Sequence, residues 1–374
     1  MRIFYFFPEL TSNMSQWQRV HFFDELTRHG VEIEAFNPLT CKSWDEANET
    51  AQKRIKKGCY DLFLSGTCSQ ALLYAETLNV ARKRGIPSLC IRFDNLVIPF
   101  ADKDFASNYD LLWLTSIETK RLYDKWGVNT VFAPYAASPY AFQYTESKLI
   151  RRVCFIGNPY GSRSRMMNTL TISGVDLDLY HGGITPNGLL SPIKSSIPPT
   201  LQMPSVSKME TFINRLRFKE GRKLIKGTIF NKLKGNLEIK CNAHLFLYPS
   251  IEVKKNCYTY SEHALSLAST SAVHTDVLRE PLKIINLRNF EIPMSGGVEL
   301  CRYNPELASY FEDGKEILFY NSNEELVEKA KYYTRVASDN EIYSIKQAAR
   351  KRAENEHTWY RRFSEVLGTL GLKI

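Results

Sequence analysis

The hydrophobic pattern of the N-terminal third of the chain alternates between short apolar runs and segments with helical spacing. Residues 2–7, 31–36 and 61–65 are apolar runs rich in aromatic and β-branched residues, which predicts buried strands. Between them, residues 15–28 and 44–56 place apolar side chains three and four positions apart, which predicts amphipathic helices. Strands that alternate with helices in this way form a parallel sheet with helices on both faces.

The same alternation predicts further strands at 88–93, 110–115 and 130–133, with helices at 70–84 and 117–126. Ligands of such sheets bind at the carboxyl ends of the strands. Asp94 follows one of these strands, so it is a candidate general base. A loop aspartate or a helix cap accounts for the same residue and stays open as an alternative.

After two prolines and a polar stretch, the alternation starts again, which indicates a second domain. Further strands are expected at 152–157, 176–180, 243–248 and 271–275, and further helices at 260–267 and from Arg165, Glu324 and Asn340 onward. We therefore predict a first domain at 1–145, a second domain at 146–340 and a C-terminal helical segment at 341–374. The length of 374 residues supports two domains, because a single core stops growing well below that size.

Composition excludes several classes of protein. Hydrophobic residues make up 44% and charged residues 24%, which is typical of a globular chain and not of a disordered one. No apolar stretch approaches the roughly 20 residues of a membrane span, and the N-terminal run is too short for a signal peptide. Eight cysteines are scattered without a Cys-x-x-Cys pair, which is typical of reduced thiols. We therefore expect a cytoplasmic protein.

The net charge of +9 is concentrated in one segment. Residues 207–242 contain ten Lys or Arg and three Asp or Glu, a difference of seven charges. The surrounding segment 183–242 lacks the strand and helix alternation, so we interpret it as an insertion in the second domain. Its apolar residues have helical spacing: Met209, Phe212, Ile213 and Leu216.

Two interpretations of this basic insertion remain open. The first is a solvated surface, and the second is peripheral attachment to an anionic membrane surface. Nucleic acid is not expected as a partner, because the chain contains no recognised DNA- or RNA-binding module.

The most informative stretch for chemistry runs from Ile285 to Tyr303. It begins Ile-Asn-Leu-Arg-Asn-Phe-Glu-Ile-Pro-Met-Ser-Gly-Gly, so Arg288 and Glu291 lie on a predicted helix and Ser295, Gly296 and Gly297 form a turn. A turn without bulky side chains lets a phosphate approach backbone N–H groups, and an arginine adds a bidentate contact. An ordinary helix, turn and strand with a surface ion pair fits the same pattern.

This stretch resembles the C-terminal domain of CgeB-like glycosyltransferases, a branch of the group 1 GT-B enzymes. The resemblance continues through Asn-Pro-Glu-Leu at 304–307 and Phe-Glu-Asp-Gly-Lys-Glu at 311–316. Residues Val153 to Gly161 resemble the family's Phe-x-Gly-x-x-Tyr-Gly-x-Arg opening. The similarity extends from about Arg152 to Phe363 and lapses within 182–242.

The resemblance implies an α/β fold of the GT-B type, with two Rossmann-like doubly wound domains that face a cleft. It implies sugar transfer from a nucleotide-sugar donor, held by the second domain, to an acceptor saccharide or lipid-linked glycan bound by the first. The C-terminal segment is expected to pack back toward the first domain. No metal and no other cofactor is expected, and the nucleotide sugar acts as co-substrate.

Carried over by position, Glu291 resembles the glutamate that binds the donor ribose, and the turn Ser295, Gly296 and Gly297 resembles the one beside the donor diphosphate. Arg288 matches the family's arginine. Glu299 mimics the paired glutamates of retaining enzymes, but the glycine turn fixes a register in which Lys283 stands where the first glutamate is expected.

Three further residues are candidates for the donor side. Gly157 permits close backbone approach after a predicted strand, and Arg163 follows it within reach of a phosphate. His274 ends the predicted strand at 271–275 and points to the same region, although a buried structural histidine fits equally. The Asp176-Leu-Asp178 sequence resembles the metal-binding pair of the other glycosyltransferase fold, but we interpret it as structural because it lies inside a predicted strand.

Two other functions remain as alternatives. A Rossmann dehydrogenase is disfavoured, because the first strand-to-helix turn at 7–13 lacks the Gly-x-Gly-x-x-Gly needed for close pyrophosphate approach. The second alternative is a catalytically idle GT-B-like protein that binds an anionic surface. It is motivated by the missing first glutamate and by the basic insertion.

Overall fold

The computed structural model describes most of the chain. The described residues are 1–9, 17–144, 148–159, 161–181, 201, 206–233, 241–245, 261–269 and 282–374. They form two compact units. The first contains Met1–Pro134, Lys194–Ile225 and Tyr360–Ile374, and the second contains Tyr135–Ile193 and Lys226–Trp359. Two segments from the second half of the chain therefore belong to the first unit.

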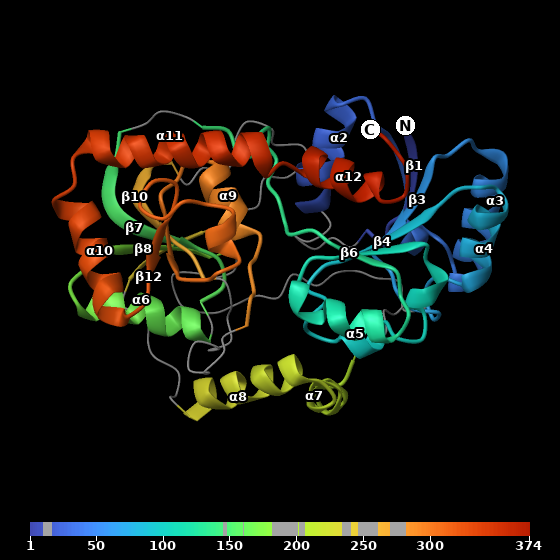
Figure 1. The fold of residues 1–374 in the computed structure, drawn as a ribbon, viewed down its shortest axis with the longest axis horizontal. Coiled ribbons are helices and arrows are strands. Elements are labelled where there is room, and N and C mark those ends of the chain that lie inside the picture. Colours follow the sequence, from blue (N-terminus) through green and yellow to red (C-terminus); the bar gives the residue numbers. More distant parts are fainter. Residues whose placement is uncertain are drawn as a thin grey trace. The chain divides into compact units, whose positions relative to one another are not determined.

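The first unit is built on a parallel sheet with the strand order β2-β1-β3-β4-β5-β6 (Figure 1). Its strands are β1 Arg2–Phe6, β2 Glu32–Phe36, β3 Leu62–Ser65, β4 Ser88–Arg92, β5 Leu111–Leu114 and β6 Thr130–Phe132. Its principal helices are α2 Asp24–Arg28, α3 Trp44–Lys57, α4 Ala75–Lys83, α5 Lys120–Lys125 and α7 Lys208–Leu216, and most of α12 Trp359–Gly368 also belongs to it. A π-helical turn, Arg19–Phe23, leads into α2.

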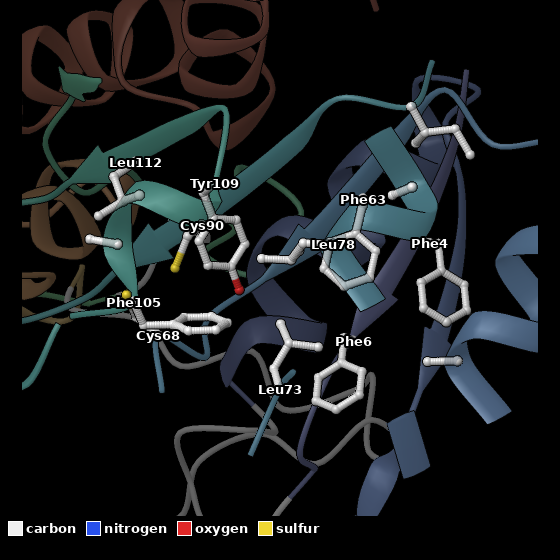
Figure 2. Close-up of a cluster of buried hydrophobic side chains, with 14 of the residues drawn as sticks. Phe4, Phe6, Phe63, Cys68, Leu73, Leu78, Cys90, Phe105, Tyr109 and Leu112 are labelled. Atoms are coloured by element: carbon white, nitrogen blue, oxygen red, sulfur yellow. The ribbon is translucent and has the colours of Figure 1, made fainter. Parts of the chain in front are cut away.

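Aromatic side chains from alternate positions of the strands fill one face of this sheet (Figure 2). Phe4 and Phe6 of β1 and Phe63 of β3 are fully buried there, and Phe4 contacts Phe63 with ring centroids 5.7 Å apart. The side-chain alternation of a strand sends residues two positions apart to the same face. The periodic apolar run at 2–7 thus produces the core that the sequence predicts.

The opposite face of the first sheet is closed by the C-terminal helix α12. Its Phe363 is fully buried, with ring centroids 5.1 Å from Trp113 of β5 and 5.2 Å from Phe22. The backbone N–H of Tyr360 donates a 2.9 Å hydrogen bond to the buried carboxylate of Glu25. Residues from the two ends of the chain therefore share one core.

The second unit is built on a second parallel sheet, with the strand order β12-β11-β10-β7-β8-β9. Its strands are β7 Ile150–Ile156, β8 Leu177–His181, β9 Asn242–Leu245, β10 His263–Leu267, β11 Glu299–Arg302 and β12 Leu318–Tyr320. Its helices are α6 Ser162–Ile172, α9 Arg288–Met294, α10 Asn323–Arg335 and α11 Asp339–Glu356, and α8 Lys219–Leu233 runs from the first unit into it. Helices α6 and α10 contribute to the apolar core on one face, while α9 contacts β11 and α11.

One predicted helix is a strand in the structure. The sequence analysis predicts a helix at 260–267, but His263–Leu267 form β10, which pairs with β7 and β11. All five residues of β10 are buried, so neither of its faces meets water. A strand buried on both faces loses the two-residue alternation that distinguishes it from a buried helix. The predicted strand at 271–275 lies outside the described residues.

Within the described part of the chain, we find no helix whose length and hydropathy suit a bilayer span.

Candidate functional site

The loop that follows β7 lies at the carboxyl edge of the second sheet. Gly157 begins this loop with φ +144°, a backbone conformation that side chains strongly disfavour, and its N–H donates to the Tyr180 carbonyl at 2.9 Å. Gly161, with φ +61°, directly precedes α6. Glycine at these two positions lets the chain turn sharply from strand to helix. Close approach of a ligand to the Gly157 backbone stays a prediction.

A pair of asparagines sets the start of α9. The Asn286 carboxamide oxygen accepts the Arg288 N–H at 2.9 Å, and the Asn289 carboxamide oxygen accepts the Asn286 N–H at 2.9 Å. These bonds satisfy backbone donors that the first turn of a helix leaves without intrahelical partners. The reciprocal cap fixes where α9 begins and therefore which way Arg288 leaves the helix. The sequence analysis missed both asparagines, although their spacing around the helix start was a usable signal.

Arg288 and Glu291 form an ion pair on α9. Arg288 also donates from Nε to the carbonyl of Ile156, the last residue of β7, at 3.2 Å. The pair is thereby attached to the same strand end that carries Gly157. The Arg288 side chain is 23% exposed, whereas Glu291 is fully buried. The guanidinium is the exposed member of the pair, so it is the group positioned to meet an anionic ligand.

The turn Ser295, Gly296 and Gly297 lies at the other end of α9. Its three N–H groups donate to the carbonyls of Glu291, Pro293 and Ile292 at 2.9, 2.8 and 2.9 Å. This turn is a helix C-cap, in which the backbone donors satisfy the last carbonyls of the helix. The sequence analysis expected these N–H groups to face a phosphate. In the structure they donate to the helix carbonyls instead. The role of the turn beside a diphosphate stays a prediction.

Gly296 is required at this turn for two reasons. Its φ of +69° is strained for any residue with a side chain. A Cβ added there would lie 2.4 Å from Cδ2 of Tyr144, because the Tyr144 ring rests against the turn. Tyr144 is thus a neighbour of the predicted site that no local sequence pattern revealed.

Two arginines of α6 shape the loop after β7. Arg163, half-buried, donates from Nη1 to the Asn158 carbonyl at 3.4 Å, and Arg165 donates from Nη2 to the Asn231 carbonyl at 3.2 Å. Arg163 therefore stays at the loop that begins with Gly157, while Arg165 reaches α8. His274 lies outside the described residues, so its predicted role is not tested by the structure.

Glu299 occupies a separate, closed environment at the start of β11. Its side chain is fully buried, and its Oε1 accepts a hydrogen bond from Asn289 Nδ2 at 2.5 Å. Burial raises the pKa of this carboxyl to about 8. No hydrogen-bond partner for Oε2 is found among the described residues. Glu299 thus joins β11 to α9 and differs from Glu291, which is paired with an arginine at the sheet edge.

In the first unit, Asp94 follows β4 in a turn with φ +50°. Its side chain is exposed, and its carbonyl accepts the Val97 N–H at 3.0 Å. The neighbouring Asn95 is buried and accepts the N–H groups of Thr115 and Ser116 at 3.0 and 2.9 Å. Asn95 therefore ties together two loops at the carboxyl edge of the first sheet. Asp94 lies at the same edge with an accessible carboxylate.

The Asp176-Leu-Asp178 sequence is part of a structural network. Asp178 is buried and accepts hydrogen bonds from Arg152 Nε at 3.0 Å and from His263 Nε2, also at 3.0 Å. Burial by itself raises the Asp178 pKa, but the bonds from Arg152 and His263 outweigh it and lower the pKa. A search of the described residues finds no group of three or more His, Cys, Asp or Glu side chains arranged to hold a metal ion.

Comparison with known proteins bears on the fold and on the C-terminal part of the chain. Residues 228–368 match a family model described as glycosyl transferase-like. A glycosyltransferase from Rickettsia africae ESF-5 has a similar structure, with a TM-score of 0.54, 12% identity and coverage of 98% of this chain and 97% of that one. Anabaena Alr3699/HepE in complex with UDP-glucose has a TM-score of 0.54 and 11% identity, with 99% of each chain covered. A search of curated protein sequences finds no match.

The fold is therefore that of GT-B glycosyltransferases, with two Rossmann-like α/β units, each built on a parallel sheet. The family-model match covers most of the described part of the second unit, including Arg288, Glu291 and the turn at Ser295. The match to the family model concerns residues 228–368, and the similarity to the solved structures concerns the fold.

Proposed function

We propose that the protein is a glycosyltransferase that takes its sugar from a nucleotide-sugar donor bound in the second unit. The observation that carries the proposal is the Arg288–Glu291 pair, attached through Arg288 to the Ile156 carbonyl at the carboxyl edge of the sheet. Ligands of open parallel sheets bind at this edge. The UDP-glucose bound by the structurally similar HepE protein supports the choice of donor class.

In this proposal, Arg288 stabilises the negative charge that develops on the departing nucleotide diphosphate. A fixed guanidinium in a site with little water supports such charge more strongly than it does in bulk water. Gly157 allows the diphosphate to approach the backbone, and Arg163 adds a second positive charge at the same loop. We propose no metal for this step, because the arginines supply the positive charge.

Glu291 is proposed to accept hydrogen bonds from the donor ribose. Its carboxylate is fully buried against Arg288, so the ion pair must open when the donor binds. We propose an exchange in which Arg288 turns to the diphosphate while Glu291 accepts the ribose hydroxyls. Both charges then keep a partner, which matters because a buried unpaired charge is strongly unfavourable.

The finer assignments are proposals as well. We propose that the chain belongs to the CgeB-like branch, acts as a hexosyltransferase in the cytoplasm and modifies a saccharide or lipid-linked glycan in surface polysaccharide synthesis. Ser295, Gly296, Gly297 and His274 are proposed to lie near the donor, and Asp94 is proposed as the base. The alternative, an idle relative, predicts nucleotide binding or surface binding without sugar transfer.

A thermal-shift panel of UDP, GDP, CMP and TDP with their common sugar conjugates tests the proposal. A ligand that binds the folded state raises the melting temperature by mass action. We expect one nucleotide to stabilise the wild type and the Glu291→Gln variant to bind it roughly tenfold more weakly or worse. Glu316→Gln is the matched control, because Glu316 is also buried and also pairs with an arginine, Arg352, at 3.0 Å.

Equal nucleotide affinity in Glu291→Gln and wild type, with both equally stable, would contradict the site assignment. A selective nucleotide whose sugar conjugate is neither transferred nor hydrolysed would favour the idle relative over the enzyme. No response to any nucleotide in the panel would contradict the proposed donor class.

A further inference from the structure

Helix α7 presents an apolar stripe to solvent. Residues Met209, Phe212, Ile213 and Leu216 are 67%, 43%, 52% and 46% exposed, although each is a large apolar side chain. Their spacing of three and four positions places them on one face of the helix. No residue of α7 is buried, so the helix does not use this stripe to pack against the first unit.

The helix is nevertheless fixed in place by the turn that follows it. Phe218 in this turn is buried and packs against Phe100, with ring centroids 6.0 Å apart. The guanidinium of Arg217 lies 4.1 Å from the Phe100 ring centroid. Arg215 donates from Nε to the Val97 carbonyl at 3.4 Å. These contacts attach α7 to the loop after β4 and leave its apolar stripe exposed.

Both ends of α7 are capped, so the helix is a formed element and not a frayed segment. The Ser207 hydroxyl accepts the Glu210 N–H at 3.0 Å at the N-terminus. At the C-terminus, Arg222 donates from Nη1 to the Leu216 carbonyl at 2.9 Å. Figure 1 shows α7 next to the start of α8.

Positive charge surrounds the stripe. Exposed basic residues are Lys208 before it and Arg217, Lys219 and Arg222 after it, against one exposed acidic residue, Glu210. We refer to the stripe and these four basic residues as the α7 surface. An amphipathic helix with Lys or Arg beside a compact apolar face is the pattern of helices that lie in a membrane interface.

We propose that the α7 surface binds the surface of an anionic lipid bilayer. The apolar stripe would enter the boundary between headgroups and acyl chains, while the basic residues contact the headgroups. A second copy of the chain fits less well, because a symmetric dimer through this surface would bring two basic clusters together. Nucleic acid fits less well too, because phosphate binding gives no role to four exposed apolar side chains.

This inference goes beyond sugar transfer and does not depend on it. If the proposed function also holds, the attachment selects the acceptor class: a glycan carried on a lipid is reached from the membrane surface, whereas a free saccharide needs no such attachment. The choice of a lipid-linked acceptor rests on the proposed function, while vesicle binding does not.

Co-sedimentation of the full chain with vesicles tests the proposal. Vesicles of phosphatidylcholine with phosphatidylglycerol are compared with vesicles of phosphatidylcholine alone. We expect binding to the anionic vesicles only, weakened by added salt. The Phe212→Gln/Ile213→Gln variant is expected to bind roughly tenfold more weakly or worse, and glutamine preserves helix propensity. The control is Ile172→Gln/Val336→Gln, which replaces two side chains that are 73% and 70% exposed elsewhere.

Three outcomes would overturn the proposal. Absence of binding to anionic vesicles excludes the bilayer as occupant. Equal loss of binding in the control variant shows that exposed apolar residues in general, and not the α7 surface, cause it. A wild-type dimer that becomes monomeric in Phe212→Gln/Ile213→Gln, measured by sedimentation without vesicles, assigns the surface to a second copy. The Phe212→Gln/Ile213→Gln variant should still bind the nucleotide in the thermal-shift assay. This measurement separates a loss of vesicle binding from a loss of the donor site.

Discussion

Replacement of Gly296 by alanine tests how tightly the turn after α9 is packed. The residue has φ +69°, and an added Cβ would meet Tyr144 Cδ2 at 2.4 Å. Gly314 is a matched control in the same unit, since it has φ +76° and nothing within 4 Å of its added Cβ. The two substitutions therefore share the backbone strain and differ in the contact with the tyrosine ring.

The expected magnitudes follow from these two effects. A left-handed conformation costs a residue with a side chain about 1–2 kcal/mol relative to glycine, which applies to both variants. Overpacking adds about 1–3 kcal/mol in Gly296→Ala alone. We expect Gly296→Ala to be less stable than Gly314→Ala by that second amount. The melting temperature of Gly296→Ala should then be lower than that of Gly314→Ala by roughly 2–10 °C.

Urea and thermal unfolding, followed by circular dichroism, measure the difference between the two variants. The double variant Gly296→Ala/Tyr144→Ala adds a stricter check, because removal of the ring should restore most of the extra loss. Equal stability of Gly296→Ala and Gly314→Ala would refute the packing of Tyr144 on the turn. The contact itself would be refuted if the double variant lost as much free energy of unfolding as Gly296→Ala and Tyr144→Ala lose together.

Two further predictions concern pH. Burial raises the pKa of Glu299 to about 8 from 4.5, so the folded state binds the proton more tightly and loses stability as pH rises through this range. The stability of Glu299→Gln relative to wild type should therefore rise by about 4 kcal/mol between pH 5 and pH 8.5, and a difference independent of pH would refute a buried neutral acid. Burial alone lowers the His263 pKa, but Cys154 and Asp178 outweigh it and raise the pKa to about 9 from 6.5. The charged His263 contributes its full stabilisation below pH 6.5 and loses it as pH rises through about 9. The free energy of unfolding of His263→Gln should therefore depend less on pH than that of wild type in this range. An unchanged pH dependence would contradict the interaction of His263 with Asp178 and Cys154.

Local sequence patterns predicted the sheet of the first unit because its strands are short apolar runs separated by helices with one polar face. All six of its strands lie within one or two residues of their predicted positions. In the second unit the same method failed at β10, since the full burial of His263–Leu267 removes the alternation that marks a strand. Periodicity therefore works best where one face of an element meets water.

The candidate site was predictable only in part. The spacing of Arg288 and Glu291 on a helix indicates an ion pair, and the structure contains it. The bond from Arg288 to Ile156, which attaches the pair to the sheet edge, joins residues 132 positions apart. No local pattern reports such a contact. The use of the turn at Ser295 as a helix C-cap was also not recognised: a glycine after a helix often ends it, and the backbone donors of the turn bond to the last helix carbonyls.

Local sequence patterns also did not indicate which unit the basic insertion packs against. The sequence analysis treated residues 183–242 as an insertion in the second domain, whereas residues 194–225 group with the first unit. The contact of Phe218 with Phe100 accounts for this placement. Its aromatic partner lies more than a hundred positions away, after a strand of the first sheet.

The packing of Phe363 against Trp113 and Phe22 also fixes an order of events during protein synthesis. A ribosome releases residues 360–374 only after every residue of the second unit has been made, and domains generally fold as units while the chain emerges. The sheet of the first unit is translated first, but Trp113 and Phe22 lack their contacts with Phe363 until α12 has been made. We therefore expect these two rings to lack one aromatic partner for the whole time in which the second unit is being synthesised.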